Sequence, residues 1–256
     1  MSLAPASTGR LLVGNDVVLV RDARCVGKSR DLRFAKRVLA PEELSNVLAS
    51  EDPDESLWLH WAAKEAAFKV VTKIEGHPPV FAHARFVVDV QRGPSRHTEW
   101  SFEASGTVTF AGVRLPFRAS VTRDRIHALS WSGEDPQREA PEIEIRTGEA
   151  SVGRSRGRVD AGIQPFALLL NERFSFHERR SIHSPPSAYV RLFARASIAE
   201  ALDVDERRLE IVSGTEATGR VPPRVLLDGL PAPVDLSLSH HGALVAWAFA
   251  VEDPRA

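Results

Sequence analysis

Apolar residues follow a helical spacing in two places along the chain, residues 58–71 (WLHWAAKEAAFKVV) and residues 189–202 (YVRLFARASIAEAL). Each predicted helix is followed by segments rich in β-branched and aromatic residues, which are typical of strands. These segments cover residues 84–90, 100–115 and 117–131 in the first half of the chain, and residues 208–214, 224–230 and 234–249 in the second. The pattern therefore predicts a helix followed by antiparallel strands, twice.

A polar stretch separates the two parts. Residues 132–158 are rich in Pro, Gly, Glu and Arg and poor in large apolar residues, as in a connector. We therefore expect a first half over residues 1–135, a connector over residues 136–158 and a second half over residues 159–256. The predicted fold class is α+β: two similar halves, each a helix packed on an antiparallel sheet, form a pseudo-twofold dimer within one chain.

The two halves also match weakly at individual positions. Aligning Lys64 with Arg195 places Lys69 opposite Glu200. Because the polar residues differ between the halves, a site built from both halves would be complete on only one side of the molecule.

Composition and charge narrow the classes of function. The chain has 256 residues, with 33 Lys and Arg against 34 Asp and Glu, which argues against a general nucleic-acid or membrane-surface role. Cys25 is the single cysteine, so an intramolecular disulfide is excluded, as suits a reducing cytosol. The apolar run at residues 11–20 is interrupted by Asn15 and Asp16, so it is too short and too polar for a membrane span, and it lacks the layout of a signal peptide. We expect a soluble, cytoplasmic protein.

Glu65 occupies an unusual place on the first predicted helix. At about 100° per residue, Trp58, Trp61 and Phe68 share its side of the helix, and Lys69 lies one turn on. A carboxylate on an apolar face needs a cation, because burying it alone costs several kcal/mol. One interpretation is an exposed Glu65–Lys69 pair worth about 0.3–0.5 kcal/mol. The other is a metal ligand beside a lysine that grips a phosphate.

Asp16 has two interpretations of its own. The Gly-Asn-Asp sequence at residues 14–16 lies between apolar flanks and is consistent with a hairpin turn. Alternatively, Asp16 is an acid on a strand and points toward Glu65. Two carboxylates, completed by water and substrate phosphates, are a usual way for proteins to hold Mg²⁺.

The segment SLSHHG (residues 237–242) precedes an apolar run. Strand alternation puts Ser237 and Ser239 on one face, with His240 at the turn. Hydroxyls, backbone amides and an imidazole together suit an anion such as phosphate. The alternative is a polar hairpin tip without a ligand.

Taken together, four segments resemble the motifs of the 4'-phosphopantetheinyl transferases: GND (14–16), RFAKRVLAPEEL (33–44), WAAKEAAFK (61–69) and SLSHHG (237–242). The first three occur in the family's order, with Ala40 in place of a hydroxyl residue. The tryptophan-to-lysine helix motif is the specific one.

The resemblance implies a role for each matching residue. Asp16 and Glu65 correspond to the family's Mg²⁺ ligands, and Glu65 and Lys69 to its catalytic residues. The residues implied to bind coenzyme A are Lys64, Lys69, Arg220, Ser239 and His240, with His240 near the 3'-phosphate.

The implied reaction transfers 4'-phosphopantetheine from coenzyme A to a serine of an apo acyl or peptidyl carrier protein and releases 3',5'-ADP. Glu65, or a water on the metal, is the candidate general base. The alternative is a non-catalytic module of the same fold that binds coenzyme A or a carrier protein. The sequence leaves open whether the carrier serves fatty acid, polyketide or non-ribosomal peptide synthesis.

Two departures from the family pattern refine these expectations. The larger, two-half members carry the serine-histidine motif first, whereas here the acids come first. The chain thus resembles two fused small subunits, so we expect one site at the interface of the halves and a chain that works as a monomer. In addition, Val18 stands where larger members often have a third acid, and it cannot bind a metal.

Because carrier proteins are usually acidic, the basic candidates for binding them are Arg24, Lys28, Arg30 and Arg33.

Overall fold

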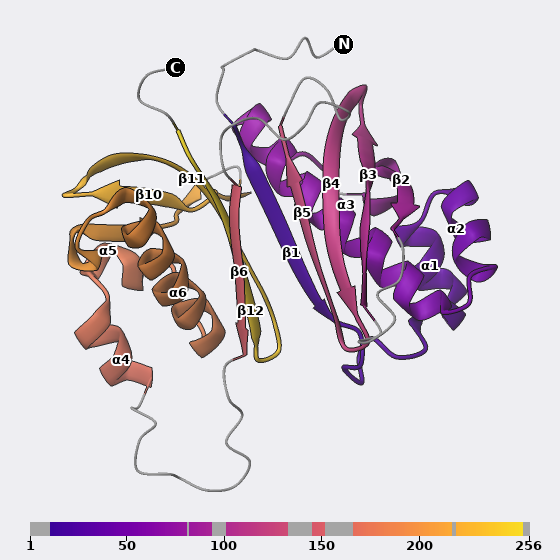
Figure 1. Cartoon of the computed structure of the whole chain (residues 1–256), viewed down its shortest axis with the longest axis horizontal. Helices are drawn as coiled ribbons and strands as arrows, with labels where there is room; N and C mark the ends of the chain where they lie inside the picture. Colours follow the sequence, from indigo (N-terminus) through magenta and orange to yellow (C-terminus); the bar gives the residue numbers. More distant parts are fainter. Residues whose placement is uncertain are drawn as a thin grey trace, which may run out of the picture.

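The computed structural model describes residues 11–80, 82–93, 101–132, 145–151, 166–216 and 219–252. They form two five-stranded antiparallel sheets, each with one long helix against it (Figure 1). The fold is therefore α+β, as predicted. The first half contains β1 (Val13–Leu19), η1 (Lys28–Arg30), α1 (Leu32–Val38), α2 (Pro41–Leu48), α3 (Pro53–Glu75), η2 (His83–Arg85), β2 (Val87–Arg92), β3 (Ser101–Phe110), β4 (Val113–Thr122) and β5 (Arg125–Trp131).

The second half repeats this plan. It contains β6 (Ile145–Ser151), α4 (Phe166–Arg173), α5 (Phe176–Arg179), α6 (Pro185–Leu202), η3 (Glu206–Arg208), β7 (Leu209–Val212), a small hairpin of β8 (Thr215–Glu216) and β9 (Gly219–Arg220), β10 (Arg224–Leu227), β11 (Leu230–His241) and β12 (Leu244–Val251).

The two sheets share one topology. The strand orders are β1-β5-β4-β3-β2 and β6-β12-β11-β10-β7, so in each sheet the first strand pairs with the last, and the long helix connects the first strand to the second. Two similar halves are thus confirmed. However, β6 lies inside the stretch 136–158 that we expected to be a connector, and that expectation is wrong for residues 145–151. This edge strand is partly exposed along its whole length and lacks the apolar pattern that marks the other strands.

A buried carboxylate recurs at the same place in both halves. In the first, Glu43 of α2 accepts hydrogen bonds from the Ala40 amide at 2.6 Å and from the Val88 amide of β2 at 2.6 Å, and it pairs with Lys64 of α3. In the second, Glu178 of α5 accepts from the amides of Ser175 at 3.0 Å and of Ile211 in β7 at 2.9 Å, and it pairs with Arg195 of α6. Each carboxylate therefore joins a short helix, the outer edge strand and the long helix, and the alignment of Lys64 with Arg195 is confirmed.

The helix α3 packs closely on β1. Four alanines of α3 are fully buried: Ala62, Ala63, Ala66 and Ala67. A Cβ at Gly14 would collide with the Ala66 carbonyl oxygen. The glycine of the Gly-x-Asp motif is thus required because the helix backbone lies directly against the strand.

The opposite face of β1 packs on the second half. Val13 belongs to one apolar cluster with Ala248 and Ala250, and Val17 to another with Leu244 and Ala246 of β12. Between these clusters lies a polar pair, Asn15 and His127.

The Asn15 side-chain amide donates to His127 Nε2 at 3.2 Å. Burial lowers the pKa of His127 to about 4, so the ring is neutral at pH 7. Beside it, Arg125 of β5 forms an ion pair with Glu149 of β6. The interface of the halves is therefore mostly small and apolar, with polar contacts that fix its register.

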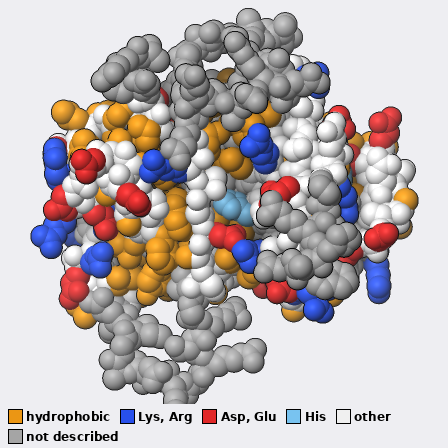
Figure 2. Space-filling view, viewed as in Figure 1, with side chains coloured by type: hydrophobic (Ala, Val, Ile, Leu, Met, Phe, Trp, Pro, Cys, Tyr) orange, Lys and Arg blue, Asp and Glu red, His pale blue; other side chains and the backbone are white. Residues whose placement is uncertain are grey.

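Figure 2 shows acidic and basic side chains interspersed over one face of the molecule, in keeping with the net charge of −1. Among the described residues, no helix is long and apolar enough to cross a membrane.

Candidate active site

The site is built where β1 meets β11. Alternate amides of β1 point away from β5 and donate to alternate side chains of β11. These bonds run from the Val13 amide to Asp235 Oδ2 at 2.7 Å, from the Asn15 amide to Ser237 Oγ at 2.9 Å, and from the Val17 amide to Ser239 Oγ at 3.2 Å. Side chains of the segment Asp235-Leu-Ser-Leu-Ser239 thus satisfy an edge that would otherwise expose unpaired amides.

Two lysines of α3 complete the junction. Lys73 Nζ donates to the Val13 carbonyl at 2.6 Å and the Leu236 carbonyl at 2.9 Å, and it forms an ion pair with Asp235 at 2.6 Å. One turn earlier, Lys69 Nζ bridges the same two strands through a β1 carbonyl and a β11 carbonyl. The long helix of the first half therefore holds a strand of the second half.

Asp16 lies at this junction, on a strand and not at a hairpin turn, so the strand alternative is confirmed. Its Oδ1 accepts a hydrogen bond from Ser239 Oγ at 2.7 Å and lies 3.5 Å from Lys69 Nζ. Burial raises the pKa of Asp16 to about 6; Lys69 opposes the shift, and the negative charge of Glu65 adds to it. Two carboxylates close enough to affect each other are what a divalent cation would neutralise.

Glu65 is partly exposed and faces an aromatic wall. Its Oε1 lies 3.2 Å from His83 Nε2, and the His83 ring stacks on Trp61 with 4.1 Å between the ring centroids. Trp61 in turn packs against Phe34 and Trp58. The aromatic cluster thus supports the His83 ring beside the Glu65 carboxylate.

The donor set of Asp16 and Glu65 fits Mg²⁺. A site that encloses a metal ion in protein ligands needs three or more His, Cys, Asp or Glu side chains. Among the described residues there is no such group. Mg²⁺ instead commonly takes one or two carboxylates and fills its other positions with water and substrate phosphates. The residues present match that second arrangement.

A cavity of about 1050 Å³ adjoins the two lysines and is lined by both halves. Lys69 and Lys73 lie on its α3 side, and His240 at the end of β11 also lines it. The opposite wall comes from α5, α6 and the segment between them, and it includes Arg180 and Arg191. A cavity with cations on both walls attracts a ligand with several negative charges.

The structure places the remaining expected residues differently. The ammonium of Lys64 is fully buried and donates to the Val38 carbonyl at 2.8 Å and to Glu43 at 2.5 Å. It points away from the cavity, so the expected contact with coenzyme A is absent from this arrangement. Ser239 is 7% exposed and joins β1 to β11 through its hydroxyl. Arg220 lies in β9, and its side chain is outside the described residues.

Several residues of the site escaped the sequence analysis. Lys73 follows Lys69 by four residues, so helical periodicity places the two on one side of the helix. Asp235 precedes Ser237 by two residues, so strand alternation places them on one face, and these spacings could have identified both residues. His83 lies outside the motifs, and it contacts Glu65 because the chain turns back after α3. Arg191 carries no signal in the sequence.

Residues 12–115 match the sequence profile of the 4'-phosphopantetheinyl transferase superfamily. Over this part, the chain is similar to the members of that superfamily. The match contains β1, the whole of α3 and thus both candidate metal ligands, Asp16 and Glu65. No curated protein sequence matches the chain.

Proposed function

We propose that the chain transfers 4'-phosphopantetheine from coenzyme A to a serine of an acyl or peptidyl carrier protein. The observation that carries this proposal is a pair of acids whose charges affect each other, Asp16 and Glu65, with Asp16 3.5 Å from Lys69, which lines a cavity with basic residues on both walls. The match of residues 12–115 to the 4'-phosphopantetheinyl transferase superfamily supports it, because phosphopantetheine transfer is the reaction that names the superfamily.

The charges of the site suit this reaction. Coenzyme A carries a pyrophosphate that repels a nucleophile, and Asp16 and Glu65 would hold Mg²⁺. When bound, Mg²⁺ supplies positive charge that offsets the negative charge of the pyrophosphate. Lys69 lines the cavity and lies 3.5 Å from Asp16, and it would stabilise charge that develops as the phosphate bond breaks.

The covalent change is a single displacement. The carrier serine oxygen bonds to the phosphorus that bears pantetheine, and the bond from that phosphorus to the bridging oxygen breaks. The electron pair leaves with 3',5'-ADP, which His240 and the basic wall of the cavity would retain. The proton of the serine passes to a base, and the Glu65 carboxylate is the candidate.

The carrier protein would approach beside the loop that follows β1. Arg24, Arg30 and Arg33 are exposed there, and Lys28 lies over the Phe34 ring. Two exposed apolar side chains share the segment, Val26 and Leu32, which are 57% and 51% exposed. Basic groups around apolar ones suit an acidic partner with an apolar contact patch.

The test is the intact mass of an apo acyl carrier protein after incubation with the chain, coenzyme A and Mg²⁺. A gain of roughly 340 Da, the mass of one phosphopantetheine, that EDTA abolishes is the expected result. Glu65→Gln should slow transfer by at least about 10²-fold, as for loss of one transition-state stabiliser. Glu55→Gln on the same helix is the control, since Glu55 pairs with Arg92 and should leave the rate within about twofold. No mass gain on several carriers, with coenzyme A still bound, would refute the transferase.

A further inference from the structure

One oxygen of each candidate metal ligand is already engaged by a side chain of the protein. In Asp16, Oδ1 accepts a hydrogen bond from Ser239 Oγ at 2.7 Å and lies 3.5 Å from Lys69 Nζ. In Glu65, Oε1 lies 3.2 Å from His83 Nε2, and among the described residues His83 is the one hydrogen-bond partner of that carboxylate. This pattern leaves the second oxygen of each acid for a cation.

The direction of the contact between His83 and Glu65 follows from the chemistry of the two groups. An ionised carboxylate accepts hydrogen bonds and cannot donate them, so the proton in this contact lies on His83 Nε2. The ring needs no positive charge to donate, because a neutral imidazole with its proton on Nε2 is sufficient. One ring nitrogen of His83 is therefore fixed as a donor to one oxygen of Glu65.

The surrounding structure holds His83 in place. Its ring stacks on Trp61, with 4.1 Å between the ring centroids and 29° between the planes. Its backbone carbonyl accepts a hydrogen bond from the Phe86 amide at 3.0 Å, at the end of the turn η2. Phe86 is fully buried and stacks on Phe110, with 4.2 Å between the centroids. The core of the first half therefore positions the donor that meets Glu65.

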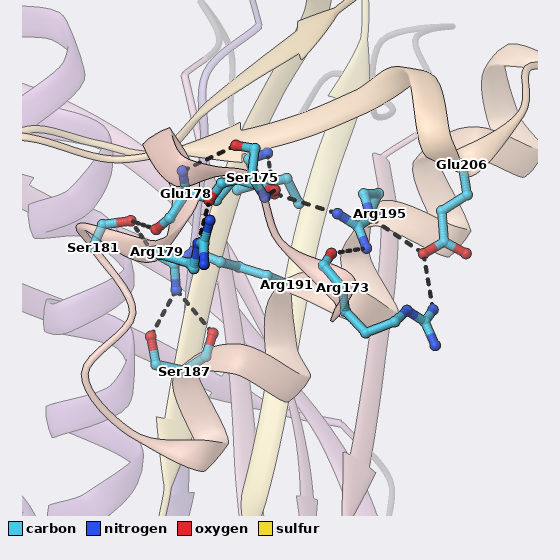
Figure 3. Close-up of polar contacts among 10 residues, drawn as sticks. Arg173, Ser175, Glu178, Arg179, Ser181, Ser187, Arg191, Arg195 and Glu206 are labelled. Atoms are coloured by element: carbon cyan, nitrogen blue, oxygen red, sulfur yellow. Dashed lines mark hydrogen bonds and ion pairs between the residues drawn. The ribbon is translucent and has the colours of Figure 1, made fainter. Parts of the chain in front are cut away.

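The second half repeats this turn with a different residue. The turn η3 precedes β7 as η2 precedes β2, so Glu206 corresponds to His83. Glu206 also reaches the long helix of its own half, where it lies 3.1 Å from Arg195, and it lies 3.6 Å from Arg173 (Figure 3). The first residue of the turn thus contacts the long helix in both halves, with an acid facing an arginine in one and a histidine facing Glu65 in the other. The fold supplies the turn, and the choice of histidine belongs to the site.

The engaged oxygen of Glu65 affects which cation the site accepts. Ca²⁺ takes more oxygen ligands than Mg²⁺, in flexible arrangements, and it often binds both oxygens of one carboxylate. Mg²⁺ is smaller, requires a nearly octahedral arrangement and commonly takes one or two carboxylates, with water and phosphates in its other positions. A proton donor on Oε1 competes with a cation for that oxygen, so it disfavours a cation that uses both oxygens of Glu65.

We propose that His83 is a positioning residue that holds Glu65 by one oxygen and determines the selectivity of the site for Mg²⁺ over Ca²⁺. Ser239 has the same part at Asp16. This inference rests on the proposed function, which assigns both acids to Mg²⁺, and it adds a residue that lies outside every motif. Loss of such a supporting contact typically costs about 10- to 100-fold in metal affinity.

The test is calorimetric titration of the full chain, saturated with coenzyme A, with Mg²⁺ and separately with Ca²⁺ at one pH. His83→Phe keeps a ring to stack on Trp61 and removes the donor, so it should weaken Mg²⁺ binding by about tenfold and leave Ca²⁺ binding within about twofold. His83→Gln removes the ring and keeps an N–H donor, so its ratio of the two affinities should lie within about threefold of the wild-type ratio. His77→Phe, in the exposed turn after α3, is the matched control and should bind both cations like the wild type.

Melting curves separate an effect on binding from an effect on folding. The His83 side chain is 20% exposed, so each variant should be folded at the temperature of the titration. His83→Leu, which lacks both the ring and the donor, is a second variant without the donor and should show the same loss of Mg²⁺ preference as His83→Phe. Wild-type preference in either of these two folded variants would overturn the inference.

The outcomes also distinguish this inference from the function beneath it. Equal loss of both cations in His83→Phe would overturn the inference and leave the transferase intact. The same holds if His83→Gln behaves like His83→Phe, because the ring and not the donor would then matter. A wild-type chain that binds neither cation in the presence of coenzyme A would overturn both proposals. Loss of Mg²⁺ preference in the variants without the donor, with the preference retained in His83→Gln, is the result that the structure predicts.

Discussion

Lys64 illustrates how a motif residue can serve the fold and not the ligand, and Lys64→Met tests that interpretation. The methionine retains most of the length and apolar bulk but removes the ammonium from a site that is 0% exposed. Glu43, 4% exposed, would then be buried without its cation. Breaking a buried ion pair in this way typically costs about 3–5 kcal/mol.

The structure favours the lower end of that range. Glu43 keeps its two amide donors, Ala40 and Val88, so its carboxylate remains partly satisfied. We therefore expect a loss of about 3 kcal/mol in the free energy of unfolding. Burial also lowers the pKa of Lys64, and the negative charge of Glu43 opposes that shift. Each charge of the pair is therefore stabilised in the interior by the other.

The assay is urea unfolding at pH 7.5 followed by calorimetric binding of coenzyme A under conditions where each variant is folded. Lys64→Met should lose stability and keep its affinity within about twofold. Lys69→Met, five residues along the same helix, should instead lose at least about tenfold in affinity, as expected for a lost charged contact. A Lys64→Met protein of unchanged stability and weakened binding would refute the reasoning and return Lys64 to the site.

Three further predictions follow from the packing of β1. Gly14→Ala should lower the free energy of unfolding by about 3 kcal/mol, because its Cβ meets the Ala66 carbonyl; unchanged urea unfolding would show that α3 can move away. His127 stays neutral in the folded chain down to a pKa of about 4 but takes up a proton when unfolded below its ordinary value of about 6.5, so stability should fall by about 1.4 kcal/mol per pH unit between pH 6 and pH 4 from this group alone. His127→Gln should remove that part of the slope in paired unfolding curves, and a slope identical to wild type would contradict the assignment. Ser239→Ala removes the hydroxyl that orients Asp16 and should weaken Mg²⁺ binding by about tenfold in calorimetry with coenzyme A present, whereas unchanged affinity would show that Asp16 needs no such support.

Much of the fold was predictable because its elements have strong periodicity. The two long helices, most strands and the duplication were all present in the pattern of residues. The edge strand β6 was missed because it is polar and partly exposed. The segment at 100–115 turned out to contain a hairpin, with its turn at Ala111 and Gly112, both with positive φ.

The site was predictable in its acids and less so in its cations. Asp16 and Glu65 were recognisable because each is an acid in an apolar setting. Lys64 and Lys69 look alike in sequence, and only the packing of α2 against α3 shows that one faces Glu43 and the other the cavity. His83 lies 18 residues from Glu65 in the chain, and such a contact leaves no local trace.

The junction of β1 and β11 has a consequence for assembly. Main-chain hydrogen bonds between strands do not depend on the side chains, so a strand can slip by two residues and still pair. Here the bonds from β1 end on named side chains, and a slip would place Ser237 where Lys73 needs Asp235. The Lys73–Asp235 ion pair therefore selects one register between the halves, and only in that register does Ser239 meet Asp16.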